Sequence, residues 1–264
     1  MNSSDIKWKM QQHRELVNYG IRHSFLRDLL SKSARTTSLE MWRELPMMVA
    51  KSMGCEFTTS TPSSSLNEIF VEKIYNVEGF VPSPKDTICD VGASYGDSSI
   101  WWSKVFGARV LAFEPLKDIY KILQSNIILN NVAVKSFNIA LGNGDPIRSR
   151  KERDMLAKSE MPDSNITETT KLDDLRIESL DILKIDVEGF EFEVLKGAKD
   201  TIIRHDPKII IETHSKNLRK ICHEFLSSLG YSLKFEGRTI ISKNPGMDRI
   251  TNLFYLRGSS INNF

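Results

Sequence analysis

Residues 86–97 constrain the fold of this chain more than any other stretch. An apolar run ends at Asp90, passes through Gly92 and Gly96, and leads into residues 98–102, which can begin a helix. Glycine has no Cβ and accepts positive φ, so the backbone of such a turn can approach a ligand, and the new helix offers free N–H groups. The stretch predicts a strand, a ligand-binding turn and a helix; a purely structural turn is the alternative.

The chain beyond this turn alternates apolar strands with amphipathic helices. We expect strands at 109–114, 134–140, 181–187, 208–212, near 231–235 and near 252–257, and helices at 115–127, 190–203 and 215–229. Continuous apolar strands separated by such helices are typical of a mainly parallel sheet that is covered on both faces. The sequence therefore predicts an α/β, doubly wound, Rossmann-like fold.

Residues 1–62 differ in character from the rest. Apolar residues recur at helical spacing between 5 and 53, and a Ser/Thr run broken by proline at 58–65 predicts a loop. We place an N-terminal helical extension and linker at 1–62 and the α/β domain at 63–264, which would start with short strands between 69 and 75. The extension is interpreted as a packing or homo-oligomer surface, with a lid over the site as the alternative.

The charge balance gives little information about partners. The 36 basic and 34 acidic residues leave a formal net charge of +2, so no global basic field indicates nucleic acid. Basic side chains do gather locally at 148–153 and between residues 22 and 35. Nucleic acid therefore stays an alternative partner rather than the favoured one.

The cysteines and the N-terminus indicate an intracellular protein. Cys55, Cys89 and Cys222 are far apart and form no Cys-x-x-Cys motif, so we expect free buried thiols rather than a zinc or disulfide framework. The first residues lack the apolar core of a secretion signal, and no run is long enough to span a bilayer. We expect a cytoplasmic protein without membrane contact.

Acidic residues close two successive strands at the edge where ligands bind in such sheets. Asp90 closes the first strand, and Glu114 closes the second, 18 residues after Gly96. A carboxylate at this second position can accept hydrogen bonds from both hydroxyls of a ribose. The pair favours a nucleoside-containing cofactor, with a helix-start carboxylate beside Pro115 as the alternative for Glu114.

Ionisable pairs follow the next two strands at a spacing of two residues. Asp186 and Glu188 follow the fourth strand, and Glu212 and His214 close the fifth. In extended geometry both members of a pair face the same side. A histidine can take a proton from a hydroxyl, and carboxylates nearby can raise its basicity. The pairs predict a catalytic site, although a lone strand-end histidine is often structural.

A series of short motifs between residues 68 and 235 resembles the FkbM family of S-adenosylmethionine-dependent methyltransferases. The run from Leu183 to Glu191 is the most specific of them. The motifs are Asp-Val-Gly-Ala at 90–93 with Gly96, Phe-Glu-Pro at 113–115, Asn-Asn at 130–131, Ala-Leu-Gly at 140–142, Leu-Asp-Asp-Leu at 172–175, Asp-Ile-Leu-Lys-Ile-Asp-Val-Glu-Gly at 181–189 and Ile-Glu-Thr-His at 211–214. Ser94 and Tyr95 depart from the Asn-hydrophobic pair expected after Gly-Ala.

The resemblance implies a seven-stranded sheet whose last strand is antiparallel, with S-adenosylmethionine as the cofactor. It implies that Glu114 binds the ribose hydroxyls and that Asp186, Glu188 and His214 face the transferred methyl as catalytic residues. The cofactor-binding set that it implies is Asp90, Gly92, Ala93, Gly96, Glu114, Pro115, Asn138, Ala140 and Asp186, with Ile139 as a further neighbour of the adenine.

The chemistry implied is attack of a substrate heteroatom on the methyl of a sulfonium, helped by alignment and by a base. His214 is the preferred base and Asp186 its rival. The Asn/Asp-Pro-Pro-aromatic sequence of many base-modifying methyltransferases is missing after the fourth strand. We therefore expect O-methylation of a small-molecule or sugar-containing acceptor. A metal-free site is the simpler expectation, with Mg²⁺ or Ca²⁺ at Asp186, Glu188 and a neighbour as the alternative.

Three other functions stay open at this stage. They are an RNA methyltransferase that uses the local basic residues, a non-catalytic binding or assembly protein that keeps the fold, and an NAD-dependent dehydrogenase. The dehydrogenase is the weakest, because the three-glycine phosphate-binding pattern is missing.

Overall fold

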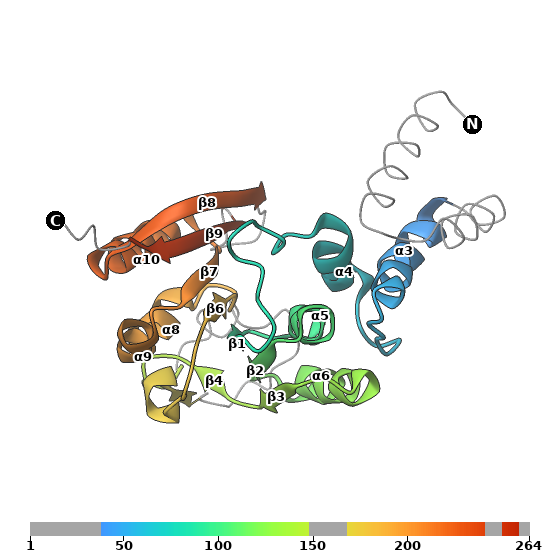
Figure 1. The fold of residues 1–264 in the computed structure, drawn as a ribbon, viewed down its shortest axis with the longest axis horizontal. Helices are drawn as coiled ribbons and strands as arrows, with labels where there is room; N and C mark the ends of the chain where they lie inside the picture. The colour runs from blue at the N-terminus through green and yellow to red at the C-terminus, as the bar shows by residue number, and fades with distance from the viewer. Residues whose placement is uncertain (1–37, 148–167, 241–249, 259–264) are drawn as a thin grey trace, which may run out of the picture.

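The computed structural model describes residues 38–147, 168–240 and 250–258 (Figure 1). Its helices are α3 (Ser38–Ser52), α4 (Ser63–Leu66), the π-helix η1 (Asn67–Glu72), α5 (Asp97–Phe106), α6 (Lys117–Asn130), the 3-10 helix η2 (Leu172–Leu175), α8 (Glu191–Gly197), α9 (Lys199–His205) and α10 (Lys216–Ser228). Its strands are β1 (Thr87–Val91), β2 (Arg109–Phe113), β3 (Val134–Phe137), β4 (Ala140–Leu141), β5 (Thr169–Thr170), β6 (Ile182–Ile185), β7 (Lys208–Thr213), β8 (Tyr231–Ile240) and β9 (Ile250–Arg257).

The main sheet has seven strands in the order β3-β2-β1-β6-β7-β9-β8. Neighbours from β3 to β7 pair in parallel, whereas β9 lies antiparallel between β7 and β8. This arrangement, in which the last strand of the chain runs against the others, is that of the class I methyltransferase fold. It confirms the predicted α/β architecture.

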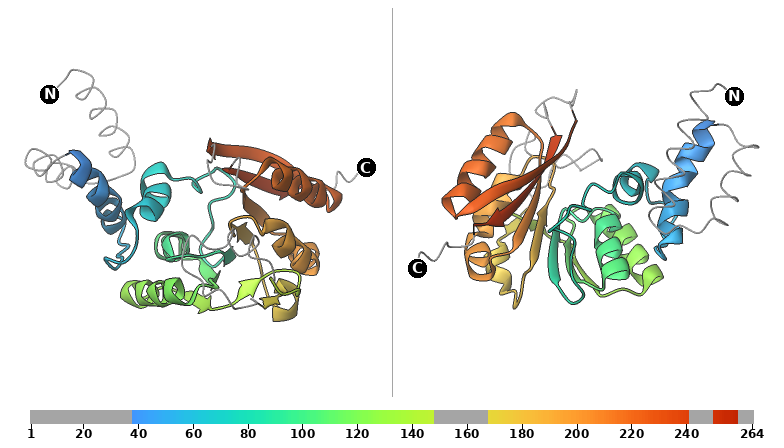
Figure 2. Two further views of the ribbon diagram at one scale, coloured as in Figure 1. Left: turned by 180° about the vertical axis from the view of Figure 1, so that it is seen from behind. Right: turned by 45° about the horizontal axis from the view of Figure 1, so that its top comes forward.

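Two hydrophobic cores cover the two faces of the sheet, because successive side chains of a strand point to opposite sides. Ile88, Ile182 and Ile210 pack on one face, together with residues of α3, η1 and α5. The residues next to them, such as Cys89 and Leu183, pack on the other face with α8, α9 and α10. The two groups of helices lie on opposite sides of the strands in Figure 2. We call the face of the sheet that carries Ile88, Ile182 and Ile210 the α5 face.

The loop expected at 58–65 is shorter than predicted, because α4 begins at Ser63. Three further predicted elements differ from the structure. The strands expected between 69 and 75 are wrong, because the apolar residues Leu66, Ile69 and Phe70 follow helical spacing and enter the core from α4 and η1. The strand expected at 134–140 ends at Phe137, and Ala140 pairs instead with Thr169 in a separate two-stranded sheet.

The third difference is a break at Ala198, which divides the helix expected at 190–203 into α8 and α9. Gly197 precedes the break, and a Cβ there would lie 1.8 Å from the carbonyl oxygen of Gly142. The close approach of these two backbones requires glycine at position 197.

The described part of the N-terminal extension packs onto the domain. Leu45, Val49 and Ala50 of α3 join the core of the α5 face, and the side chains of Asn126 and Asn130 on α6 hydrogen-bond to residues 56–61. α3 confirms helix in this extension, and the rest of its predicted helical region, up to residue 37, lies outside the described residues. The boundary between 62 and 63 stays a prediction. The three cysteines are free and buried, as expected.

Candidate active site

A cavity of about 550 Å³ opens at the carboxyl ends of β1, β2, β6 and β7. Sites for small molecules usually measure about 300–1,000 Å³, so this cavity can enclose a nucleoside-sized ligand. Its walls are the turn after β1, the ends of the other three strands, and the segment from Pro62 to Tyr75 that lies over them. The cavity is thus where the sequence predicts a ligand.

The turn after β1 is built on two glycines that cannot be replaced without strain. Gly92 has a φ of +78°, and a Cβ there would lie 1.8 Å from the carbonyl oxygen of Asp186. Gly96 has a φ of +85°, and its Cβ would lie 2.5 Å from a methyl of Leu123. The turn therefore packs against the end of β6 and against helix α6. Because Gly92 has no side chain, its backbone lies on the cavity wall. We call this turn the Gly92 turn.

Asp90 lies beneath this turn and does not line the cavity. Its fully buried carboxylate accepts hydrogen bonds from the hydroxyls of Ser98 (2.7 Å) and Ser99 (2.6 Å) and pairs with Nζ of Lys184 at 3.0 Å. The same Nζ donates a hydrogen bond to the carbonyl oxygen of Gly92 (2.8 Å). Asp90 and Lys184 thus hold the turn from below.

Lys184 is the residue of this support that sequence reasoning missed. Burial disfavours its charge, but the attraction of Asp90 and Asp186 outweighs burial and raises the pKa of Lys184 above its ordinary value. The sequence does contain a signal for Lys184, because it is a single cation in a strand whose other residues are Ile, Leu and Ile. In the sheet, Lys184 is in register with the buried Asp90. A charge at such a position requires a partner of opposite sign.

Glu114 lines the cavity at the end of β2. Its carboxylate accepts hydrogen bonds from the backbone N–H groups of Ser94 (3.0 Å) and Leu116 (2.8 Å), so the turn after β1 and the start of α6 fix its position. Burial raises the pKa of Glu114 to about 7, although these two hydrogen bonds oppose the shift. The amide of Asn138 donates hydrogen bonds to the carbonyls of Glu114 and Pro115, so Asn138 stabilises the connection between β2 and α6.

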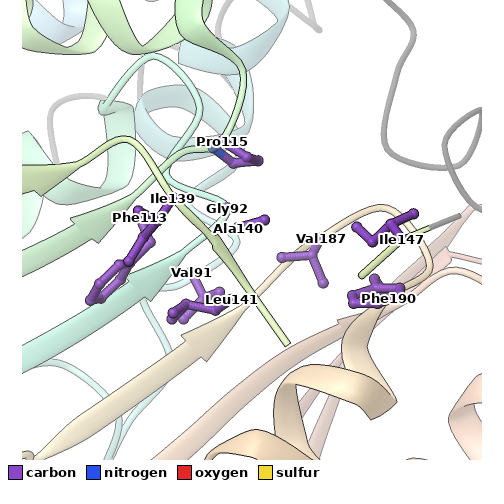
Figure 3. A pocket seen from close by; sticks show the side chains of 10 residues that line it. All are labelled: Val91, Gly92, Phe113, Pro115, Ile139, Ala140, Leu141, Ile147, Val187 and Phe190. Carbon is purple, nitrogen blue, oxygen red and sulfur yellow. The ribbon is translucent and has the colours of Figure 1, made fainter. Parts of the chain in front are cut away.

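An apolar pocket lies beside Glu114 (Figure 3). Ile139 and Ala140 form it together with Pro115, Val187 and Phe190, among others. The sticks in Figure 3 come from strand ends and turns that are far apart in the sequence. The lining is apolar, but the pocket encloses only about 20 Å³, which is close to the space that one water molecule needs.

Four ionisable side chains gather on the other side of the Gly92 turn. From Nε2 of His214, the nearest carboxylate oxygen of Glu188 is 3.6 Å away, that of Glu212 is 3.6 Å away and that of Asp186 is 3.8 Å away. Ile185 pairs with Ile211 in the β6–β7 register, so Asp186 and Glu212 follow directly at adjacent strand ends. We call these four residues the acidic cluster.

The extended geometry predicted for Asp186 and Glu188 is wrong, although both side chains do converge on His214. Strand β6 ends at Ile185, and Glu188 has a φ of +55° in a turn rather than extended geometry. The turn, and not strand alternation, brings Glu188 to His214.

Glu191 orients the histidine and was missed, because it lies inside α8 rather than at a strand end. Nδ1 of His214 donates a 2.7 Å hydrogen bond to the fully buried Glu191 carboxylate, which also accepts from the N–H of Gly189. Burial disfavours a charged His214, but this hydrogen bond and the negative charges of Glu191, Asp186 and Glu212 raise its pKa to about 10. A base role for His214 therefore requires that this proton leaves first.

Segment 62–75 forms the wall of the cavity that faces the acidic cluster. Ser65 donates a hydrogen bond to Asp97, whose pKa burial raises to about 7, and the ring of Tyr75 lies near Lys184. Asn126 links this segment to the turn, since its amide donates to Thr61 and to the carbonyl of Tyr95. Neither Asp97 nor Tyr75 was predicted, because their packing on the site is set by tertiary contacts.

The structure gathers most of the predicted site residues around this cavity. Those that line it are Gly92, Glu114, Pro115, Asp186, Glu188 and His214. Ala140 lines the apolar pocket, Asp90, Ala93 and Gly96 are not among the lining residues of either space, and neither is Asn138. The basic residues at 148–153 and 22–35 lie outside the described residues.

Sequence comparison decides the family. The sequence model of the methyltransferase FkbM domain matches residues 90–233, more than half of the chain and all four strand ends of the site. The chain belongs to this family. The chain therefore carries a methyltransferase domain of this family, and the resemblance inferred from its motifs is confirmed.

Curated relatives of this methyltransferase are distant. The AMB antimetabolite synthetase AmbE of Pseudomonas aeruginosa is 28% identical over 197 residues, a match that covers 56% of this chain and 9% of AmbE. Methyltransferase sdnD of Sordaria araneosa is 25% identical over 210 residues, covering 63% of this chain and 80% of sdnD. The chain thus spans a small part of AmbE and most of sdnD.

Among solved structures, a methyltransferase FkbM from Methylobacillus flagellatus KT aligns with a TM-score of 0.46 and 20% identity. The alignment covers 80% of this chain and 59% of that one. Within the described residues of our FkbM-family chain, no helix is long and apolar enough to cross a membrane.

Proposed function

We propose that this FkbM-family chain transfers a methyl group from S-adenosylmethionine to an oxygen of a small-molecule or sugar-containing acceptor. The observation that carries the proposal is a single cavity that joins Glu114, the Gly92 turn and the acidic cluster. The groups that we assign to the ribose, to the close backbone approach and to proton transfer thus line one cavity.

In this proposal the cofactor extends across the carboxyl ends of β1 and β2. The ribose hydroxyls donate to Glu114, which the N–H groups of Ser94 and Leu116 hold in place. The adenine lies at the apolar lining of Ile139 and Ala140, where side chains must move to admit it, because the pocket between them encloses only about 20 Å³. Asp90 is a positioning residue in this proposal. It pairs with Lys184, which donates to the Gly92 carbonyl and so keeps the turn beneath the cofactor in position.

The methyl would then point to the acidic cluster. The acceptor oxygen attacks the methyl carbon, the carbon–sulfur bond breaks, and its electron pair stays on sulfur to give S-adenosylhomocysteine. The hydroxyl proton passes to a carboxylate of the Asp186–Glu188 pair. These two side chains expose 27% and 41% of their surface, whereas that of His214 exposes 2%, so they are the more accessible to an acceptor. Nε2 of His214 lies 3.8 Å from Asp186 and 3.6 Å from Glu188.

The charge of the cavity favours a small acceptor over RNA. The lining residues include Asp97, Glu114, Asp186, Glu188 and Glu212, and the cations among the lining residues are Lys184 and His214, both deeply buried. Phosphates of a polynucleotide would meet like charges at this wall. A small-molecule acceptor also fits the name of one relative, an antimetabolite synthetase.

Calorimetry with ligand-free protein tests the cofactor half of the proposal. Wild type should bind S-adenosylhomocysteine, and Glu114→Gln should weaken binding roughly 10- to 100-fold, because hydrogen bonds to a charged group contribute about 1.5–3 kcal/mol. Glu193→Gln, which changes a carboxylate on α8 that pairs with Lys196, serves as the matched control. Wild-type protein that binds no S-adenosylhomocysteine would rule the proposal out.

Labelled methyl transfer tests the acceptor half. Purified protein with methyl-labelled S-adenosylmethionine is offered a panel of hydroxyl-bearing small molecules and glycosides, and in parallel a pool of RNA. Transfer to oxygen of a panel member is the expected outcome. Salt-dependent transfer to RNA alone would replace this acceptor class with the RNA alternative.

The homo-oligomer expected through the N-terminal helices stays a prediction. Residues 1–37, which carry most of the helical pattern, lie outside the described part of the chain.

A further inference from the structure

The acidic cluster contains the donor set of a metal site. Asp186, Glu212 and His214 each offer one ligand atom, and these three atoms lie within 4.8 Å of one another. They come from the ends of adjacent strands β6 and β7, on elements that the core of the sheet holds rigid. Two carboxylate oxygens and one imidazole nitrogen therefore converge on one point of the cavity wall.

The imidazole of His214 is oriented toward this point. Its side chain is almost fully buried, and its Nδ1 is fixed on Glu191 at 2.7 Å, so Nε2 faces the three carboxylates. The distances of 3.6–3.8 Å from Nε2 to these oxygens are too long for hydrogen bonds. Ligands that share one cation at about 2.0–2.2 Å stand roughly 3.0–3.5 Å apart, so small side-chain shifts would complete the site.

The charges around this point are unbalanced. Four acidic side chains, those of Asp90, Asp186, Glu191 and Glu212, lie near two basic ones, Lys184 and His214. Glu188 adds a further carboxylate at the rim. Partly buried carboxylates at this density are costly unless a cation compensates them.

We propose that Asp186, Glu212 and His214 bind a divalent first-row transition-metal cation, with Glu191 as the positioning residue for His214. A carboxylate that accepts the second N–H of a ligating histidine is the usual partner of such a ligand. The imidazole selects Mn²⁺ or Zn²⁺ over Mg²⁺ and Ca²⁺, which prefer oxygen ligands throughout.

The catalytic role of the cation rests on the proposed methyl transfer. A cation here lies beside the point where the acceptor hydroxyl meets the methyl, so it can bind that oxygen and lower the pKa of the hydroxyl. Asp186 then serves as a ligand, and Glu188, the more exposed of the pair, is left to take the proton. Cation binding itself does not depend on this role.

Mn²⁺ titration followed by electron paramagnetic resonance tests the inference. The full chain is treated with chelator, and the loss of the free Mn²⁺ signal should show one bound ion per chain. Asp186→Asn and Glu212→Gln should each weaken binding at least tenfold, and Glu191→Gln about 10- to 100-fold. Glu224→Gln, which changes an exposed carboxylate on α10, should bind Mn²⁺ as wild type does.

Glu114→Gln separates this inference from the proposed function. It should keep Mn²⁺ binding and lose affinity for S-adenosylhomocysteine, because Glu114 lies outside the acidic cluster. Wild-type protein without a stoichiometric Mn²⁺ site, or variants at both Asp186 and Glu212 that bind as wild type, would overturn the metal site and leave the methyltransferase proposal standing. Mn²⁺ binding without S-adenosylhomocysteine binding would support the site and overturn that proposal.

Discussion

Removal of the Lys184 ammonium tests how the turn after β1 is supported. Lys184→Met keeps most of the side-chain volume and removes the charge that lies 3.0 Å from Asp90 and the donor to the Gly92 carbonyl. Both side chains are almost completely buried, with exposed fractions of 4% for Lys184 and 0% for Asp90. The substitution therefore leaves the carboxylate of Asp90 buried without a counter-charge.

The expected loss of folding free energy is large. Breaking a buried ion pair from one side costs about 3–5 kcal/mol, and here the hydroxyls of Ser98 and Ser99 still bind Asp90, which places the cost near the lower end. A loss of about 3 kcal/mol corresponds to a drop in melting temperature of roughly 6–12 °C for a domain of this size. It is also a large part of a typical total stability of about 5–15 kcal/mol.

Urea unfolding followed by circular dichroism measures the change. Lys121→Met is the matched control, since Lys121 forms the same kind of pair with Asp118 at 2.8 Å on the exposed surface of α6, and it should change stability far less. Asp90→Asn combined with Lys184→Met removes both charges and should recover about 2 kcal/mol relative to Lys184→Met alone.

Two results would refute this reasoning. One is a Lys184→Met protein within about 1 kcal/mol of wild type, which would mean that Asp90 is hydrated or neutral in the folded state. The other is a double variant no more stable than the single one, which would attribute the loss to packing rather than to charge.

Three further outcomes follow from the site. Affinity for S-adenosylhomocysteine should fall below pH 7, by up to the 10- to 100-fold expected for Glu114→Gln, because Glu114, whose pKa burial raises to about 7, then loses its charge and part of its capacity to accept ribose hydrogen bonds. Gly92→Ala should lower both cofactor affinity and melting temperature more than Gly79→Ala, since both glycines have positive φ but a Cβ at 79 meets nothing within 4 Å. Asp186→Asn should reduce methyl transfer at least about 100-fold while S-adenosylhomocysteine binding persists.

Each of these has a contrary outcome. Calorimetry that gives the same affinity at pH 6 and pH 8 would remove Glu114 from the ribose site. Equal melting temperatures for the two alanine variants would show that the Gly92 turn relaxes away from β6. Full transfer activity in Asp186→Asn would remove the catalytic role from Asp186 and leave Glu188 as the proton acceptor.

Strand ends were the part of the site that could be predicted. Asp90, Glu114, Asp186 and His214 each follow an apolar run, and parallel strands deliver their carboxyl ends to one edge of the sheet. The helical turn at 69–70 was missed because a short apolar run fits a strand or a helix equally well. Glu191 was missed because an acidic residue in the first turn of a helix is usually exposed.

The sequence by itself determined the order of strands and helices, the glycine turn and the family, because these depend on local backbone preferences and on short motifs. Only the tertiary structure decided which charges meet. It directed Asp90 away from the cavity and onto Lys184, fixed His214 on Glu191, and placed segment 62–75 over the cluster. Coulomb energies and desolvation depend on distances between residues far apart in the chain, and packing of the sheet and its helices sets those distances.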